Sequence, residues 1–150
     1  MKKTLFVGIL FVVLGFLVGK MLYYKLDGVK PTFSNQNTYY FLQEGVYSSE
    51  DIMNENTKKL SSKLITNNDN KYYVYLGITK SLENAKKIEK LYKDKGYDIY
   101  LKEFSFSNEE FSTNVDQFDK LIESTNDLDD ILTIEEVVLS NYEEIVGKDK

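Results

Sequence analysis

Aromatic, amide and lysine side chains recur at every second position in segments of this 150-residue chain, and together they could bind a sugar. Pyranose rings present C–H faces that pack on aromatic planes, while amide and ammonium groups supply directional hydrogen bonds. The candidate binding residues are Phe41, Gln43, Lys71, Tyr73, Tyr75 and Tyr100. If these segments are strands, side-chain alternation places the candidates on one face of a sheet.

The chain offers little for catalysis. It contains no Cys and no His, which excludes thiol nucleophiles, Ser–His or Cys–His pairs, disulfides and the usual zinc sites. Its paired carboxylates are Glu109 with Glu110, Glu135 with Glu136, and Glu143 with Glu144. Helix neighbours point about 100° apart, so we interpret these pairs as helix-surface charge that cannot flank a substrate. We therefore predict a protein that is not an enzyme and that uses no cofactor or metal ion.

An internal repeat indicates which elements position the candidate residues. Residues 40–49 align with residues 72–81, and each unit has the pattern of a strand, a Gly, a short polar turn and a helix. A further alternating strand follows Gly96. The resulting order βαββαβ predicts an α+β fold of the ferredoxin-like type. Its four-stranded antiparallel sheet has the first and third strands in the centre and two helices on one face.

The same pattern predicts where the elements begin and end. Helices are expected to start near Ser49 and Ser81, Gly96 is expected to end the second helix, and residues 67–70 are expected to turn a hairpin. The side chains expected beneath the helices are Leu42, Val74, Leu76, Ile99 and Leu101. The opposite face, which carries the candidate binding residues, is then predicted to be open.

Residues 39–104 resemble a SPOR domain, a module first named from sporulation proteins and common in bacterial division proteins. The resemblance rests on the strand FLQEGVYSS, a later strand ending in Gly77, a helix start of the type Ser81, Glu83, Ala85, and a terminal Gly-Tyr strand. It implies binding to glycan strands of peptidoglycan from which amidases have removed the stem peptides, and so a location at division septa. It also implies a glycan contact at Gln43.

The chain departs from the usual SPOR pattern at Val46, Tyr73 and Ile78, where Ser, Arg and Pro are common, and Glu44 replaces an inward apolar residue. An alternative is therefore a membrane-tethered adaptor whose degenerate domain binds another protein and no glycan. An RNA recognition motif shares the βαββαβ order and stacks bases on its first and third strands. The near-neutral charge of residues 39–104 and the lack of Arg weigh against nucleic-acid binding.

Residues 1–24 predict a membrane anchor. The segment from Thr4 to Gly19 is uncharged, and the apolar run reaches Tyr24 if Lys20 snorkels. It would span about 31 Å as a helix, close to one hydrocarbon core. A cleaved signal peptide is the alternative, although no A-x-A-like site follows. We expect a single-pass protein of the cell membrane with the bulk of the chain extracytoplasmic, joined by a linker at residues 25–38.

Residues 105–150 form an acidic extension with 13 acidic side chains and 3 Lys. We predict two amphipathic helices, with capping boxes at Ser107 with Glu110 and at Thr133 with Glu136, and with Gly147 as the final stop. Their apolar faces are Phe111, Val115, Phe118 and Ile122, and Val137, Val138, Tyr142 and Ile145. The helices could pair with each other, bind a division or sporulation protein, or dock on the open sheet face. In the last case, removal of residues 105–150 should raise ligand affinity.

Overall fold

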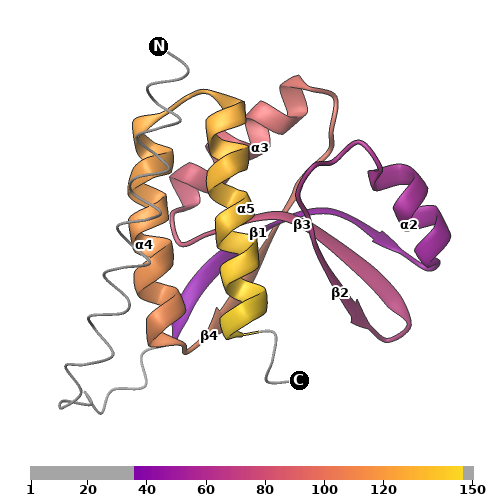
Figure 1. The fold of residues 1–150 in the computed structure, drawn as a ribbon, viewed down its shortest axis with the longest axis horizontal. Coiled ribbons are helices and arrows are strands. Elements are labelled where there is room, and N and C mark those ends of the chain that lie inside the picture. Colours follow the sequence, from indigo (N-terminus) through magenta and orange to yellow (C-terminus); the bar gives the residue numbers. More distant parts are fainter. Residues whose placement is uncertain (1–35, 147–150) are drawn as a thin grey trace. The chain divides into compact units, whose positions relative to one another are not determined.

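One antiparallel sheet organises the α+β fold. A computed structural model of the chain describes residues 36–146, which contain four strands and four helices (Figure 1). The strands are β1 (Asn37–Tyr47), β2 (Leu64–Asn68), β3 (Lys71–Thr79) and β4 (Tyr100–Phe106). The helices are α2 (Glu50–Thr57), α3 (Leu82–Asp94), α4 (Glu109–Ser124) and α5 (Leu128–Ile145). No helix within residues 36–146 is long and apolar enough to cross a membrane. The predicted anchor at residues 1–24 lies outside the described residues.

The strand order confirms the predicted topology. It is β2-β3-β1-β4, with antiparallel pairing throughout, so β1 and β3 occupy the centre. The hairpin between β2 and β3 turns at Asp69 and Asn70, whose φ angles are 50° and 59°. Two positive φ angles are typical of the two-residue hairpin turn that Asp and Asn tolerate. The turn thus occupies the second half of the predicted segment, and β2 is longer than predicted.

Helix α3 begins and ends where the sequence predicts. Ser81 caps its first turn through a side-chain hydrogen bond. At the other end the N–H groups of Gly96 and Tyr97 donate to the carbonyls of Lys93 and Tyr92 at 2.9 and 3.1 Å. This pair of bonds is a Schellman motif, and the Tyr92 and Tyr97 rings contact each other across it with centroids 6.1 Å apart.

We expect Gly96→Ala to lower the free energy of unfolding by about 1 kcal/mol. The φ of Gly96 is +89°, and a Cβ at this position would meet no atom of the described residues within 4 Å, so the cost comes from the backbone conformation. Urea denaturation followed by circular dichroism measures it. Lys95→Ala is the control, because Lys95 has a negative φ. Equal stability of the two variants would contradict this explanation of the helix stop.

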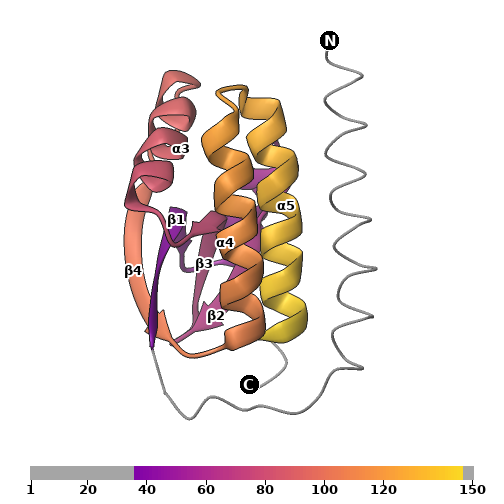
Figure 2. The same ribbon diagram turned by 90° about the vertical axis from the view of Figure 1, so that its left-hand side faces the viewer.

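Helices α4 and α5 lie side by side along the sheet face that the sequence predicted to be open (Figure 2). Helix α5 contacts β3 and β2, and the Tyr142 ring of α5 lies 5.4 Å from the Phe41 ring of β1. The predicted exposure is therefore wrong for the centre of this face, whereas Lys71 and Tyr100 on the same face are exposed as predicted. Phe41, Gln43 and Tyr75 are 3%, 7% and 5% exposed. The physical reason is that short amphipathic helices gain stability by burying their apolar faces, and this aromatic face accepts them.

Helix α4 has the predicted apolar face but a different cap. Asn108, and not Ser107, is the N-cap, since its side-chain oxygen accepts a hydrogen bond from the Phe111 N–H at 2.9 Å. Asn and Ser cap helices about equally well, so two adjacent candidates could not be separated by residue type. The predicted apolar residues Phe111, Val115, Phe118 and Ile122 are all buried.

Helix α5 is longer than predicted. It begins after Asp127, whose carboxylate accepts a hydrogen bond from the Asp129 N–H at 2.9 Å. Thr133 therefore lies inside the helix, where its hydroxyl donates to the Asp129 carbonyl, and the predicted second capping box is wrong. The buried residues of α5 are Ile131, Ile134, Glu135, Val138 and Leu139. The predicted stop at Gly147 lies outside the described residues.

The buried carboxylate of Asp119 fastens α4 to the end of β3. It accepts hydrogen bonds from the Thr79 hydroxyl, from the Lys80 N–H at 2.9 Å and from the Asn84 side chain at 2.9 Å. Asp119 is 6% exposed. Because Asn84 belongs to α3, this one side chain joins two helices and a central strand.

The buried carboxylate of Glu135 fastens α5 to the same strand. Its Oε2 accepts a hydrogen bond from the Ile78 N–H at 2.9 Å, whereas its Oε1 is buried and has no hydrogen-bond partner among residues 36–146. Gly77 makes room for it, since a Cβ there would lie 2.7 Å from the Glu135 Cδ. The interpretation of the Glu135–Glu136 pair as helix-surface charge holds for Glu136 and is wrong for Glu135.

Candidate functional site

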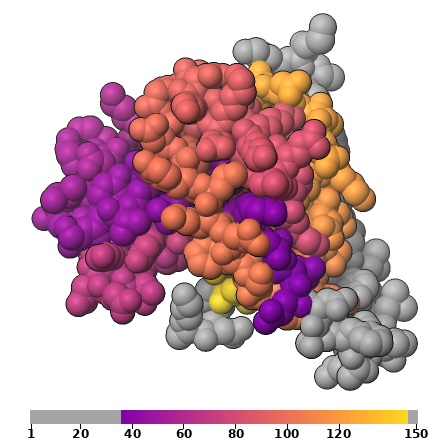
Figure 3. All heavy atoms as spheres, turned by 180° about the vertical axis from the view of Figure 1, so that it is seen from behind, coloured from indigo at the N-terminus to yellow at the C-terminus, as the bar shows by residue number. Residues whose placement is uncertain are grey.

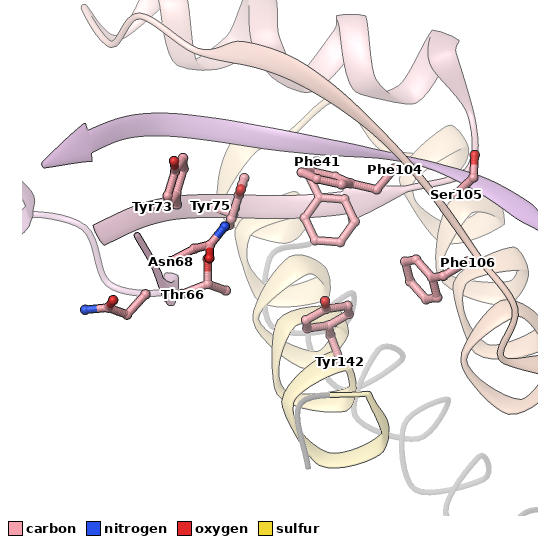
Figure 4. Close-up of a pocket in the computed structure, with 10 residues that line it drawn as sticks. Phe41, Thr66, Asn68, Tyr73, Tyr75, Phe104, Ser105, Phe106 and Tyr142 are labelled. Atoms are coloured by element: carbon pink, nitrogen blue, oxygen red, sulfur yellow. The ribbon is translucent and has the colours of Figure 1, made fainter. Parts of the chain in front are cut away.

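A groove of about 450 Å³ remains between the sheet and the C-terminal half of α5 (Figure 4). It is lined by Phe41, Thr66, Asn67, Asn68, Tyr73, Tyr75, Phe104, Ser105, Phe106 and Tyr142. Six of these side chains are aromatic, four carry a hydroxyl or amide without an aromatic ring, and none is charged. The volume lies within the usual range for small-molecule sites.

The central strands form the floor of the groove. The Phe41 and Tyr75 rings meet edge to face with centroids 5.3 Å apart. Burial raises the pKa of Tyr75, and the neighbouring Tyr73 and Tyr142 raise it further, while a hydrogen bond with Thr66 opposes the rise. The Tyr75 hydroxyl therefore stays protonated at neutral pH, where it can donate a hydrogen bond.

The edge strand β4 supplies one wall. Its Phe104 ring lies 4.9 Å from the Phe41 ring, and its Phe106 ring stacks on Tyr39 at 4.3 Å. Phe104 is nevertheless 43% exposed. Seen from behind in Figure 3, β4 (orange) lies at the surface beside the end of α5 (yellow). A ligand in the groove can therefore reach the Phe104 ring from solvent.

The opposite edge strand β2 supplies the polar groups. Thr66 pairs with Tyr73 across the β2–β3 ladder, and the neighbouring Asn67 and Asn68 are exposed. The amides of Asn67 and Asn68 make no hydrogen bond within residues 36–146. Each free amide can therefore both donate and accept a bond to a ligand.

Three of the six predicted binding residues line the groove, namely Phe41, Tyr73 and Tyr75. Gln43 lies beside it, in register with Tyr75 on one neighbour and Tyr100 on the other, and its amide makes no hydrogen bond within the described part of the chain. Lys71 is exposed at the start of β3, next to the hairpin turn, and Tyr100 is 56% exposed on β4. Lys71 and Tyr100 are not groove-lining residues.

The sequence interpretation missed the remaining walls of the groove. Phe104 is the last residue of the predicted strand and was not singled out, and Phe106 lies two positions beyond it, so following the alternation of β4 to its end would have found both. Asn67 and Asn68 were assigned to the hairpin turn, whereas they are the last two residues of β2 and the turn follows them. Tyr142 was correctly placed on an apolar helix face, but no local pattern specifies which surface such a face packs against.

Comparisons of the chain with known protein families, with curated proteins and with solved structures found no match. The resemblance to SPOR domains therefore rests on the motifs within residues 39–104.

Proposed function

We propose that this chain is a membrane-anchored SPOR-like module that binds peptidoglycan glycan strands lacking stem peptides. The observation that carries the proposal is the uncharged groove, because its rings can pack on sugar faces while its hydroxyl and amide groups bond sugar hydroxyls. Stem peptides bear carboxylates, and the described residues that line the groove include no cation to attract them. Binding of this kind would localise the protein in cell division, sporulation or wall remodelling.

The surroundings of the groove favour a neutral ligand over nucleic acid. Helix α5 carries Glu143 and Glu144 directly after the groove residue Tyr142, and both are exposed. Carboxylates at this position repel phosphate groups, whereas nucleic-acid binders present Lys and Arg to the backbone. The predicted anchor at residues 1–24 and the short linker would hold the module close to the outer surface of the membrane, next to the wall.

The test is co-sedimentation of the purified full chain, in mild detergent, with isolated cell-wall sacculi. We expect binding that rises after amidase digestion, and about tenfold weaker binding for Tyr73→Ala, since loss of about 1.4 kcal/mol is a tenfold change. Tyr72→Ala is a matched control, because Tyr72 is the neighbouring half-buried tyrosine of the same strand on the opposite face. Wild-type protein that stays in the supernatant with digested sacculi would refute the proposal.

The acidic surface of the extension favours a second candidate, the protein-binding adaptor. Of the twelve acidic side chains between residues 105 and 146, all except Asp119 and Glu135 lie outside the buried core, and Lys120 is the single cation there. A basic division or sporulation protein could bind this surface. In that case Tyr73→Ala and Gln43→Ala would leave septal localisation unchanged, whereas replacing Glu123 and Glu136 by Lys would abolish it.

A further inference from the structure

We infer that Tyr142 of α5 contacts the ligand directly, so that the C-terminal helices complete the binding site as a fixed wall. This inference rests on the proposed function of the groove. It assigns a ligand contact to the acidic extension, outside the segment that resembles a SPOR domain.

The position of Tyr142 is the first argument. Figure 4 shows its ring below Phe41, with Phe106 on one side and Thr66 and Asn68 on the other. It therefore stands between the aromatic wall of β4 and the polar edge of β2. A sugar lying along the floor of the groove would pass over it.

The rigidity of the ring is the second argument. Tyr142 packs edge to face on three rings, with centroids 5.4 Å from Phe41, 5.5 Å from Phe111 and 6.0 Å from Phe106. A side chain that is already held in place loses little conformational entropy when a ligand binds. Tyr142 is therefore preorganised.

The free hydroxyl is the third argument. The Tyr142 hydroxyl makes no hydrogen bond within residues 36–146, although the side chain is half-buried. Burial raises the pKa of Tyr142, so the hydroxyl carries its proton at neutral pH. It can donate one bond and accept others, which suits a sugar hydroxyl or an acetamido group.

The attachment of the helices argues against a lid that opens. Phe111 and Ile131 are fully buried, and Asp119 and Glu135 hold α4 and α5 to β3 through buried hydrogen bonds from the Thr79 hydroxyl and the Ile78 N–H. Opening would expose all of these groups together. Loss of the wall should therefore weaken binding, whereas loss of a lid would strengthen it.

The experiment compares Tyr142→Phe and Tyr142→Ala in the full chain in detergent. The probe is a set of short soluble glycan fragments released from amidase-treated sacculi, and the dissociation constant is measured by calorimetry. We expect Tyr142→Phe to raise the dissociation constant about fivefold with unchanged thermal unfolding, because it loses one hydrogen bond and keeps the ring. Tyr142→Ala should raise it further. Tyr72→Phe is the control for loss of a tyrosine hydroxyl outside the groove.

Two results would overturn the inference while the proposed function stands. One is an unchanged dissociation constant for both Tyr142 variants when Tyr73→Ala weakens binding. The other is tighter binding by Tyr142→Ala, which would identify α5 as a lid. If the wild-type chain binds neither the fragments nor the digested sacculi, the proposed function itself fails, and the inference fails with it.

Discussion

Asp119→Ala is expected to lower the free energy of unfolding by about 3 kcal/mol. The substitution leaves the Lys80 N–H without its acceptor and removes the carboxylate partner of Thr79 and Asn84. A buried donor left unpaired costs about 1–3 kcal/mol, and more than one donor is affected. Urea denaturation followed by circular dichroism measures the change. A loss of this size is a large share of the stability of a small domain, which is about 5–15 kcal/mol.

Asp116→Ala is the matched control for Asp119→Ala. Asp116 lies on the same helix and its carboxylate is 2.7 Å from the Lys80 ammonium, but its side chain is 53% exposed. Exposed ion pairs contribute about 0–1 kcal/mol, so this variant should be nearly as stable as the wild type. Similar losses of unfolding free energy in the two variants would show that the burial of Asp119 does not explain its contribution to stability.

Glu135→Gln is expected to stabilise the protein at neutral pH and to make its stability less dependent on pH. Burial raises the pKa of Glu135 well above its usual range, and Asp119 raises it further, while the Ile78 N–H opposes the rise. The neutral Glu135 carboxyl makes its full contribution to the free energy of unfolding below the pKa of about 4.3 that a Glu has in the unfolded chain. This contribution is lost as the pH rises toward the pKa of Glu135 in the folded protein. Within that window this group lowers stability by about 1.4 kcal/mol per pH unit. Gln cannot ionise, yet it keeps an oxygen for the Ile78 N–H.

The measurement is urea denaturation of both proteins at a series of pH values. The series runs from about pH 4, near the usual pKa of a Glu carboxyl, to about pH 8, above neutrality. The two stabilities should converge toward the acid end and separate as the pH rises. Glu136→Gln, at the exposed neighbouring position, should follow the wild-type curve. A variant Glu135→Gln that is less stable than the wild type at neutral pH would show that the ionised carboxylate is the stabilising form.

Local signals in the sequence determined the strand order, the hairpin and the boundaries of α3. Gly96 can adopt φ +89° at no steric cost, and Asp69 and Asn70 tolerate positive φ, so each residue marks a turn by its own chemistry. Strand alternation likewise identified Phe41, Tyr73 and Tyr75 as residues of one face. These features depend on neighbours along the chain, and a single sequence contains that information.

Only the tertiary structure decided what covers that face. The sequence of α5 does not distinguish Glu135 from Glu136. Only Glu135 is buried, because Gly77 on β3, distant in sequence, leaves space for its side chain. The groove exists because Tyr142 contacts Phe41, a residue 101 positions away in the sequence. A periodic pattern within one helix or strand does not predict such a contact. An amphipathic sequence pattern indicates that a helix has an apolar face, but it does not indicate which surface that face packs against. The partner of that face is set by the shape and burial of surfaces far apart in the chain.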